Sequence, residues 1–283
     1  MIYLILAIVG SALISIVMRL SEGKIKGRIS MLAANYATCM IMASFYIGWG
    51  NMIPTGEKVG ITTSMGLFNG ILYVVSLVLM QINIRKNGVT LPNVFSKLGS
   101  LIVPLIASVI FFGEVPGVLQ IVGAVIAMLS IVSINKGSEQ SAVASMGMLA
   151  VIFVVDGLGS VMSKVFGEVC NPLLSDHFLL FTFASAFAVC LVMIIKGKET
   201  FGLNEIIYGM GIGIPNFLSS RFLLQALAEL PAVVVYPTRG VATIVLISLA
   251  GVLMFKERLS RRQWYAMGAI LVSVALLNIY YDT

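Results

Sequence analysis

Long runs of apolar residues divide this chain, and they limit what it can fold into more than any other feature does. A bilayer core about 30 Å thick needs about 20 apolar residues in one helix to cross it. Ten runs come close to that length, and only short connections separate them. We therefore expect an all-α membrane protein with ten transmembrane helices. The predicted helices cover residues 2–18, 30–49, 61–82, 89–112, 116–135, 146–165, 177–195, 206–227, 231–255 and 263–281.

The composition excludes a soluble domain. Hydrophobic residues make up 59% of the chain and charged residues only 11%, whereas soluble proteins average about 25% charged residues. The net charge of +6 lies mostly in short loops, where it indicates orientation in a membrane rather than binding of nucleic acid. The lipid bilayer is therefore the expected partner. The first run lacks a basic leader and a cleavage site, so it is predicted to remain as a helix.

No pattern in the sequence predicts a cofactor, a metal or an enzyme. The three cysteines lie far apart and have no metal-binding spacing. The chain also lacks a paired nucleophile and base, and a glycine loop that could hold a phosphate. We expect a protein that is not an enzyme and that contains no metal.

The sequence is written twice. A shift of 143 residues aligns the two copies without a gap. An internal repeat determines architecture before any local motif does. We predict an N-terminal five-helix repeat (1–135), a linker (136–145) and a C-terminal five-helix repeat (146–283). The matching pairs are Gly66 and Gly209, Gly70 and Gly213, Ser76 and Ser219, Glu114 and Glu257, Gln120 and Gln263, Ser130 and Ser273, and Asn135 and Asn278.

The distribution of basic residues predicts that the second repeat is inverted in the membrane. Thirteen Lys and Arg residues lie in the odd-numbered loops or at their helix ends, and two, Lys58 and Lys164, lie in the even-numbered ones. The positive-inside rule then places both termini on the extracytoplasmic side. Five helices in each half, an odd number, also require opposite orientations. An inverted repeat is the plan of many secondary transporters.

Three stretches resemble the drug/metabolite transporter superfamily, specifically its ten-helix EamA-type members. They are PLIASVIFFGE at 104–114, ALAELPAVVVYP at 226–237 and FKERLSRRQ at 255–263. The resemblance covers essentially the whole chain. It implies a substrate cavity between the two halves, lined by the first, third, fourth, sixth, eighth and ninth helices. It also implies transport by alternating access in the plasma (inner) membrane.

A second resemblance is to the small multidrug resistance proteins, and it rests on MRLSEG at 18–23 and on YPTR at 236–239. That family carries a membrane-embedded glutamate eight residues before a basic residue. Here the corresponding positions hold Ser11 and Asp156. Tyr236 matches a binding-site tyrosine of the family, but Arg239 replaces its tryptophan. These departures count against export of polyaromatic cations.

Asp156 is the one acidic residue that lies well inside an apolar run, so we expect it to be functional. Two roles remain open for it. Desolvation would favour a protonated carboxyl and would allow proton or ion coupling. A nearby cation, Lys97, Arg221 or Arg239, would instead hold it in an ion pair.

The three intramembrane cations favour an anionic or zwitterionic solute. We expect Lys97 and Arg239, which lie in equivalent helices, to bind it, with Arg221 as a third cation. Proline residues, among them Pro92, are expected to kink the helices around the site. Other polar side chains predicted to line the cavity are Tyr236, Asn93, Ser96, Asn69, Asn216 and Ser11.

Three further residue types receive structural predictions. Glycines four residues apart, such as Gly209 and Gly213, are expected to allow close packing of helices. Glu114 is predicted to cap the helix that follows it. His177 is predicted to lie in solvent at the membrane interface.

The favoured function is secondary active transport, with export, of a small polar metabolite such as an amino acid. The coupling ion is open, and the chain is expected to act as a monomer or a homodimer. Two alternatives remain: an exporter of cations or drugs that uses Asp156, and an accessory subunit of a flippase for lipid-linked sugars.

Overall fold

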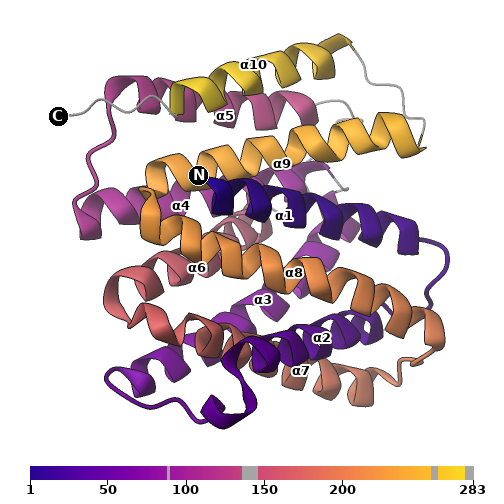
Figure 1. Cartoon of the computed structure of the whole chain (residues 1–283). Helices are drawn as coiled ribbons and strands as arrows, with labels where there is room; N and C mark the ends of the chain where they lie inside the picture. Colours follow the sequence, from indigo (N-terminus) through magenta and orange to yellow (C-terminus); the bar gives the residue numbers. More distant parts are fainter. Residues whose placement is uncertain (88–89, 136–145, 256–260, 278–283) are drawn as a thin grey trace. The chain divides into compact units, whose positions relative to one another are not determined.

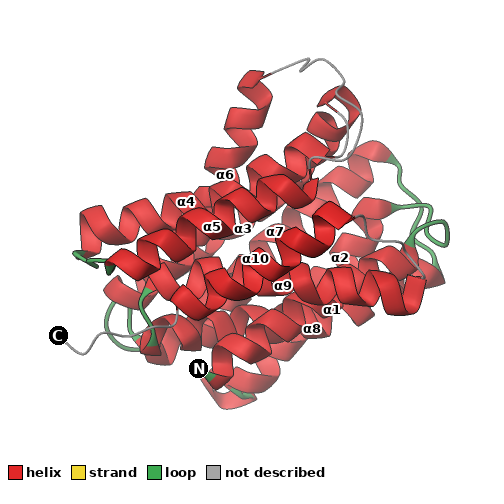
Figure 2. Cartoon of the chain, turned by 90° about the horizontal axis from the view of Figure 1, so that it is seen from above, coloured by secondary structure: helices red, strands yellow, loops and turns green. Residues whose placement is uncertain are grey.

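The chain folds into helices throughout the part that the structure describes. The computed structural model describes residues 1–87, 90–135, 146–255 and 261–277, and these contain helices and loops but no strand (Figures 1 and 2). The predicted all-α fold is therefore confirmed. The α-helices are α1 (Ile2–Ser21), α2 (Arg28–Ile47), α3 (Val59–Asn87), α4 (Thr90–Phe112), α5 (Val118–Asn135), α6 (Met146–Val169), α7 (Ser175–Gly197), α8 (Leu203–Glu229), α9 (Ala232–Phe255) and α10 (Arg261–Leu277). Two short 3-10 helices cover Trp49–Asn51 and Pro172–Leu174.

Seven of the described helices, α1 to α4, α6, α7 and α9, are long and apolar enough to cross a membrane. Helices α5 and α10 contribute shorter apolar segments, Val118–Ser130 and Trp264–Leu277. Helix α8 is long, but it carries polar side chains such as Asn216 and Arg221 in its interior. The chain is a multi-pass helical membrane protein. Its predicted orientation stays a prediction.

Packing divides the chain into two compact units. Unit 1 contains residues Met1–Val74 and Val165–Ala226, and unit 2 contains Val75–Lys164 and Leu227–Thr283. The boundaries fall within α3, α6 and α8. Each unit thus combines helices from both predicted repeats, and the repeat boundaries themselves stay a prediction.

In unit 1, two pairs of helices approach each other closely at glycines: α8 with α2, and α3 with α7. Helix α2 packs along α7 (Figure 1). In α8, a Cβ added at Gly213 would lie 2.6 Å from Cβ of Thr38 and 2.7 Å from the carbonyl oxygen of Asn35, both in α2. Gly70 of α3 meets the backbone of α7 at Thr182 in the same manner. The predicted role of these glycines in close packing is confirmed.

Aromatic side chains fill the interior of unit 1. The rings of Phe166 and Phe178 stack with centroids 4.5 Å apart, and Phe183 and Phe217 are fully buried. His177 is also buried, and its Nε2 lies 2.9 Å from the carbonyl oxygen of Asn51. The prediction that His177 lies in solvent was wrong, because the ring is buried and has a backbone partner in the connection between α2 and α3.

Two glutamates, one in the connection before α8 and one in the first turn of α8, bond to the start of α2 and the connection before it. Glu199 accepts hydrogen bonds from the backbone N–H groups of Ile29 and Ser30, at 3.0 and 3.2 Å. Glu205 accepts from the N–H groups of Lys26, at 2.7 Å, and Gly27, at 3.1 Å, and these bonds lower the pKa of its carboxyl. A depressed pKa means that this contact stabilises the fold above the ordinary glutamate pKa and is lost as the pH falls through the lower value.

In unit 2, α5 packs antiparallel to α10, and both lie beside α9 (Figure 1). A buried cluster of Leu101, Ala127, Val241 and Ile270 joins α4, α5, α9 and α10. Pro92 lies in the first turn of α4, where a proline removes no intrahelical hydrogen bond. The predicted kink therefore has no basis at Pro92, whereas Pro104 and Pro237 do lie inside α4 and α9.

We predict that Gly213→Ala destabilises unit 1 by about 1–3 kcal/mol, because the added methyl group would force α8 away from α2. Gly211→Ala is the matched control, since a Cβ there meets only a side-chain atom of Val17 at 3.4 Å. Thermal unfolding in detergent measures the difference. Equal stability of the two variants would contradict the close contact.

Candidate functional site

Asp156 lies in α6, more than two turns from either end of the helix, and is half-buried. Its carboxylate accepts a hydrogen bond from the hydroxyl of Ser76 in α3. The same carboxylate interacts with the hydroxyl of Ser96 and, electrostatically, with the ammonium of Lys97, both in α4. Three helices of unit 2 therefore converge on one carboxylate.

Glycines explain why α4 and α6 come close enough for these contacts. Gly99 of α4 lies against the backbone of Phe153 with no room for a Cβ. Gly157 of α6 lies against the side chain of Val103 in the same way. Because Asp156 is next to Gly157, and Lys97 is two residues before Gly99, the close approach also brings the charged groups together.

The charge of Lys97 interacts with one group of opposite charge and one of like charge. Its ammonium is near enough to both the Asp156 carboxylate and the Arg239 guanidinium for the charges to interact. Lys97 is exposed and Arg239, in α9, is half-buried. The sequence left Lys97, Arg221 and Arg239 open as partners of Asp156. The ammonium of Lys97 is near enough for an electrostatic interaction, and the ion-pair role of Asp156 stays a prediction.

Tyr236 fixes α9 to α6 beside this group. The buried phenol donates a hydrogen bond of 2.7 Å to the backbone carbonyl oxygen of Ser160. Ser160 in turn donates its hydroxyl to the backbone carbonyl oxygen of Asp156, at 3.1 Å. Asp156, Ser76, Ser96, Lys97, Tyr236 and Arg239 form what we call the Asp156 site. All six belong to unit 2.

Arg221 has a different partner from the one that the sequence suggested. It belongs to unit 1, where its Nε and Nη2 donate to the two carboxylate oxygens of Asp176 at 2.7 and 3.3 Å. Its guanidinium also lies 4.3 Å from the ring centroid of Tyr46. Asp176 lies in the first turn of α7, so a carboxylate at a helix end holds Arg221.

Three other predicted site residues connect helices within unit 1. The hydroxyl of Ser11 in α1 shares a hydrogen bond of 2.8 Å with that of Ser219 in α8. Asn216 of α8 donates to the side chain of Asn35 at 3.1 Å. Asn69 of α3 donates to the hydroxyl of Thr182 at 3.4 Å. Their predicted contact with substrate stays a prediction. The side chain of Asn93 lies outside the described residues.

Sequence reasoning missed Ser76, Ser160 and Lys164. Ser76 had a signal, because it is one of the residues that recur at the repeat distance. Lys164 was counted only as an orientation signal at the end of the predicted helix 146–165, but it is buried in α6, and its ammonium bonds to Glu114 at 2.6 Å. Glu114 caps α9 and not, as predicted, the helix that follows it.

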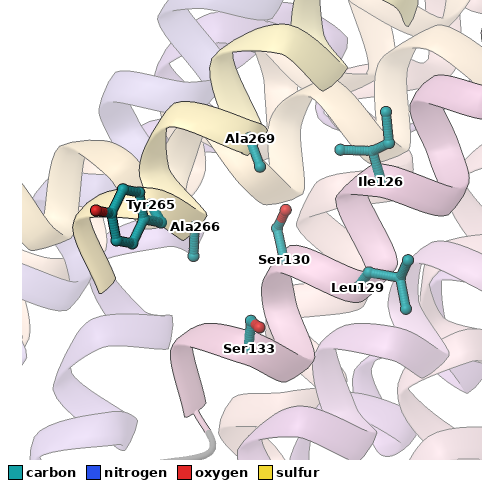
Figure 3. A pocket seen from close by; sticks show the side chains of 7 residues that line it. All are labelled: Ile126, Leu129, Ser130, Ser133, Tyr265, Ala266 and Ala269. Atoms are coloured by element: carbon teal, nitrogen blue, oxygen red, sulfur yellow. The ribbon is translucent and has the colours of Figure 1, made fainter. Parts of the chain in front are cut away.

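A groove between α5 and α10 in unit 2 is separate from the Asp156 site (Figure 3). Ser130 and Ser133 of α5 and Ala266 and Ala269 of α10 form much of its wall, and Tyr265 lies at one end. None of the predicted site residues lines it. Among the described residues, no group of acidic, His and Cys side chains could hold a metal.

Comparison with known proteins gives one family match. Residues 176–270 match the family model for "Small Multidrug Resistance protein". This stretch runs from α7 into α10, so it contains Tyr236 and Arg239 but neither Lys97 nor Asp156. The second resemblance seen in the sequence is supported there, and the EamA-type assignment stays a prediction.

Two longer matches extend over nearly the whole chain. A protein of Haemophilus influenzae (strain ATCC 51907 / DSM 11121 / KW20 / Rd), named "Uncharacterized protein", is 25% identical over 291 residues, which cover 98% of this chain and 97% of that protein. A solved structure described as "Crystal structure of protein" is 16% identical and has a TM-score of 0.74 over 98% of this chain and 96% of that one. The latter shows a shared fold.

We predict that Arg221 and Asp176 are coupled in stability, because they form a two-point ion pair that is only about one-fifth exposed. A double-mutant cycle with Arg221→Gln and Asp176→Asn should give a coupling energy of about 1 kcal/mol in detergent unfolding. Strictly additive effects would contradict the pairing and would leave Arg221 available for a solute.

Proposed function

We propose that this protein is a secondary transporter of small polar metabolites that carry an anionic group. Amino acids and related zwitterions are the leading class, with export by alternating access as the expected mode. Lys97 and Arg239 bind the anionic group, and Ser96 and Tyr236 orient it. Asp156 either organises the two cations or carries a coupling proton. The plasma membrane is the proposed location.

The balance of charge at the Asp156 site carries this proposal. The charge of Lys97 interacts with those of Asp156 and Arg239, and all three residues belong to helices that are long and apolar enough to cross a membrane. Charged groups inside a bilayer are costly, and they are retained where they perform a function. Two cations close together attract a solute carboxylate, whereas they repel a cationic solute. The arrangement therefore favours an anionic group.

The proline inside α9, next to Tyr236 and near Arg239, also supports solute binding at the Asp156 site. Pro237 lies inside α9 between Tyr236 and Arg239. A proline in a helix interior removes one backbone hydrogen bond and leaves a carbonyl group that needs a polar partner. In a membrane such a carbonyl is tolerated where it meets protein or water. Transporters commonly place their binding sites at such interruptions.

A second candidate is export of cationic compounds, and the match of residues 176–270 to the small multidrug resistance family favours it. In that case Asp156 would bind the cation directly. Lys97 and Arg239 weigh against this function, because they would repel the solute. The following two experiments separate the candidates.

We predict that Lys97→Ala and Arg239→Ala each reduce uptake of carboxylate-bearing solutes by roughly tenfold or more, since each removes a charge-assisted hydrogen bond to the solute. Purified protein in proteoliposomes with labelled amino acids provides the measurement. Lys196→Ala is the control, because this exposed lysine lies at the end of α7. Normal transport by both site variants would contradict the proposed anion binding.

Asp156→Asn tests the two roles of the carboxylate. If Asp156 carries a proton, the variant loses accumulation driven by a pH gradient and retains exchange of substrate across the membrane. If Asp156 organises the cations, the variant loses both activities and folds less well. We expect the second result, because Ser76 and Ser96 hydrogen-bond to the carboxylate and the charge of Lys97 interacts with it. Unchanged uptake at every pH would remove Asp156 from the mechanism.

A further inference from the structure

Glu114 follows the end of α4, and its carboxylate reaches two other helices of unit 2. Its Oε1 accepts hydrogen bonds from Nζ of Lys164 in α6, at 2.6 Å, and from the backbone N–H of Ala232, at 3.1 Å. Its Oε2 accepts from the N–H of Val233 at 3.4 Å. Ala232 and Val233 begin α9, where the N–H groups lack partners within the helix and favour a negative charge. One carboxylate therefore fastens α6 and caps α9.

The ion pair of Glu114 and Lys164 is largely shielded from solvent, and the turn before Glu114 orients its side chain. The side chains of Lys164 and Glu114 are 4% and 15% exposed. Lys164 also lies 5.5 Å from the ring centroid of Phe112. Gly113 has a φ of 67°, which glycine adopts without strain, and the reversal directs Glu114 back towards α9. Removing one member would leave the other charge poorly compensated.

The pair lies on the same face of α6 as Asp156. Asp156, Ser160 and Lys164 are spaced four residues apart, so they share one side of the helix over about 12 Å. Tyr236 of α9 bonds to the carbonyl oxygen of Ser160, between the two charged groups. Helix α9 thus meets α6 at two successive points: its first turn through Glu114 and Lys164, and its second turn through Tyr236.

We propose that Glu114 and Lys164 are a positioning pair for the Asp156 site. By fastening the first turn of α9 to α6, they set the place of Tyr236, and of Arg239 three residues beyond it, relative to Asp156. Neither residue of the pair needs to touch the solute. The consequence for transport rests on the proposed function, whereas the fastening of α9 does not.

Hydrogen exchange tests the fastening directly. In nanodiscs, amide exchange over residues 232–235 should be roughly tenfold faster or more in Glu114→Ala than in the parent protein, since the variant removes the acceptor of two N–H groups. Glu114→Gln should show a smaller increase, because its amide oxygen can still accept. Glu57→Gln, at an exposed position, is the control. Exchange at the control level in both Glu114 variants would overturn the proposal.

A charge exchange separates the helix cap from the ion pair. Glu114→Lys combined with Lys164→Glu restores opposite charges but presents an ammonium to the N–H groups of α9. We expect exchange at α9 to stay fast. Recovery to the parent rate would show that the ion pair alone suffices, and it would overturn the capping role.

Transport kinetics then test the effect on the site. In Glu114→Gln, the half-saturating solute concentration should rise severalfold more than the maximal rate falls, because the pair places binding groups without touching the solute. If the variant merely contained fewer folded molecules, the maximal rate would fall and the half-saturating concentration would not change. That result would overturn the positioning role. If exchange responds as expected but the parent protein carries no solute, the proposed function fails and the fastening of α9 stands.

Discussion

The cost of placing a carboxylate inside a membrane-spanning helix is the constraint on which the candidate site depends. A buried charge is stabilised only by hydrogen bonds and by an opposite charge. Asp156 obtains both: hydroxyl groups from Ser76 and Ser96, and the ammonium of Lys97. Gly99 and Gly157 remove side-chain volume between α4 and α6, so that these partners can reach it. The glycines near Lys97 and Asp156 therefore allow the two helices that carry these charges to approach each other.

Equivalent positions of the predicted repeat have different hydrogen-bond partners in the two units. Ser76 and Ser219 occupy the same place in the predicted repeat, and each bonds to the first helix of the other repeat. In unit 1, Ser219 meets the neutral hydroxyl of Ser11. In unit 2, Ser76 meets Asp156. Unit 1 thus joins its helices through neutral hydrogen bonds at these positions, whereas unit 2 contains the intramembrane charges to which we assign solute binding.

The helices could be predicted from the sequence because the length of an apolar run depends only on neighbouring residues in the chain. Close packing at Gly209 and Gly213 could also be predicted, since small residues four apart lie on one helix face. The partners of charged residues could not. Arg221 was grouped with Lys97 because both lie inside apolar runs, but the fold brings Asp176 of α7 to Arg221 of α8. Glu114 reaches α9, more than a hundred residues away, although sequence spacing pointed to the adjacent helix.

The central claim is that the Asp156 site selects solutes with an anionic group. Purified protein in proteoliposomes, supplied in turn with amino acids, dicarboxylates, neutral sugars and quaternary amines, tests it most directly, with charge movement recorded on a solid-supported membrane. The account predicts saturable currents or exchange with carboxylate-bearing solutes, abolished in Lys97→Ala. Transport of quaternary amines without transport of any carboxylate-bearing solute would contradict it.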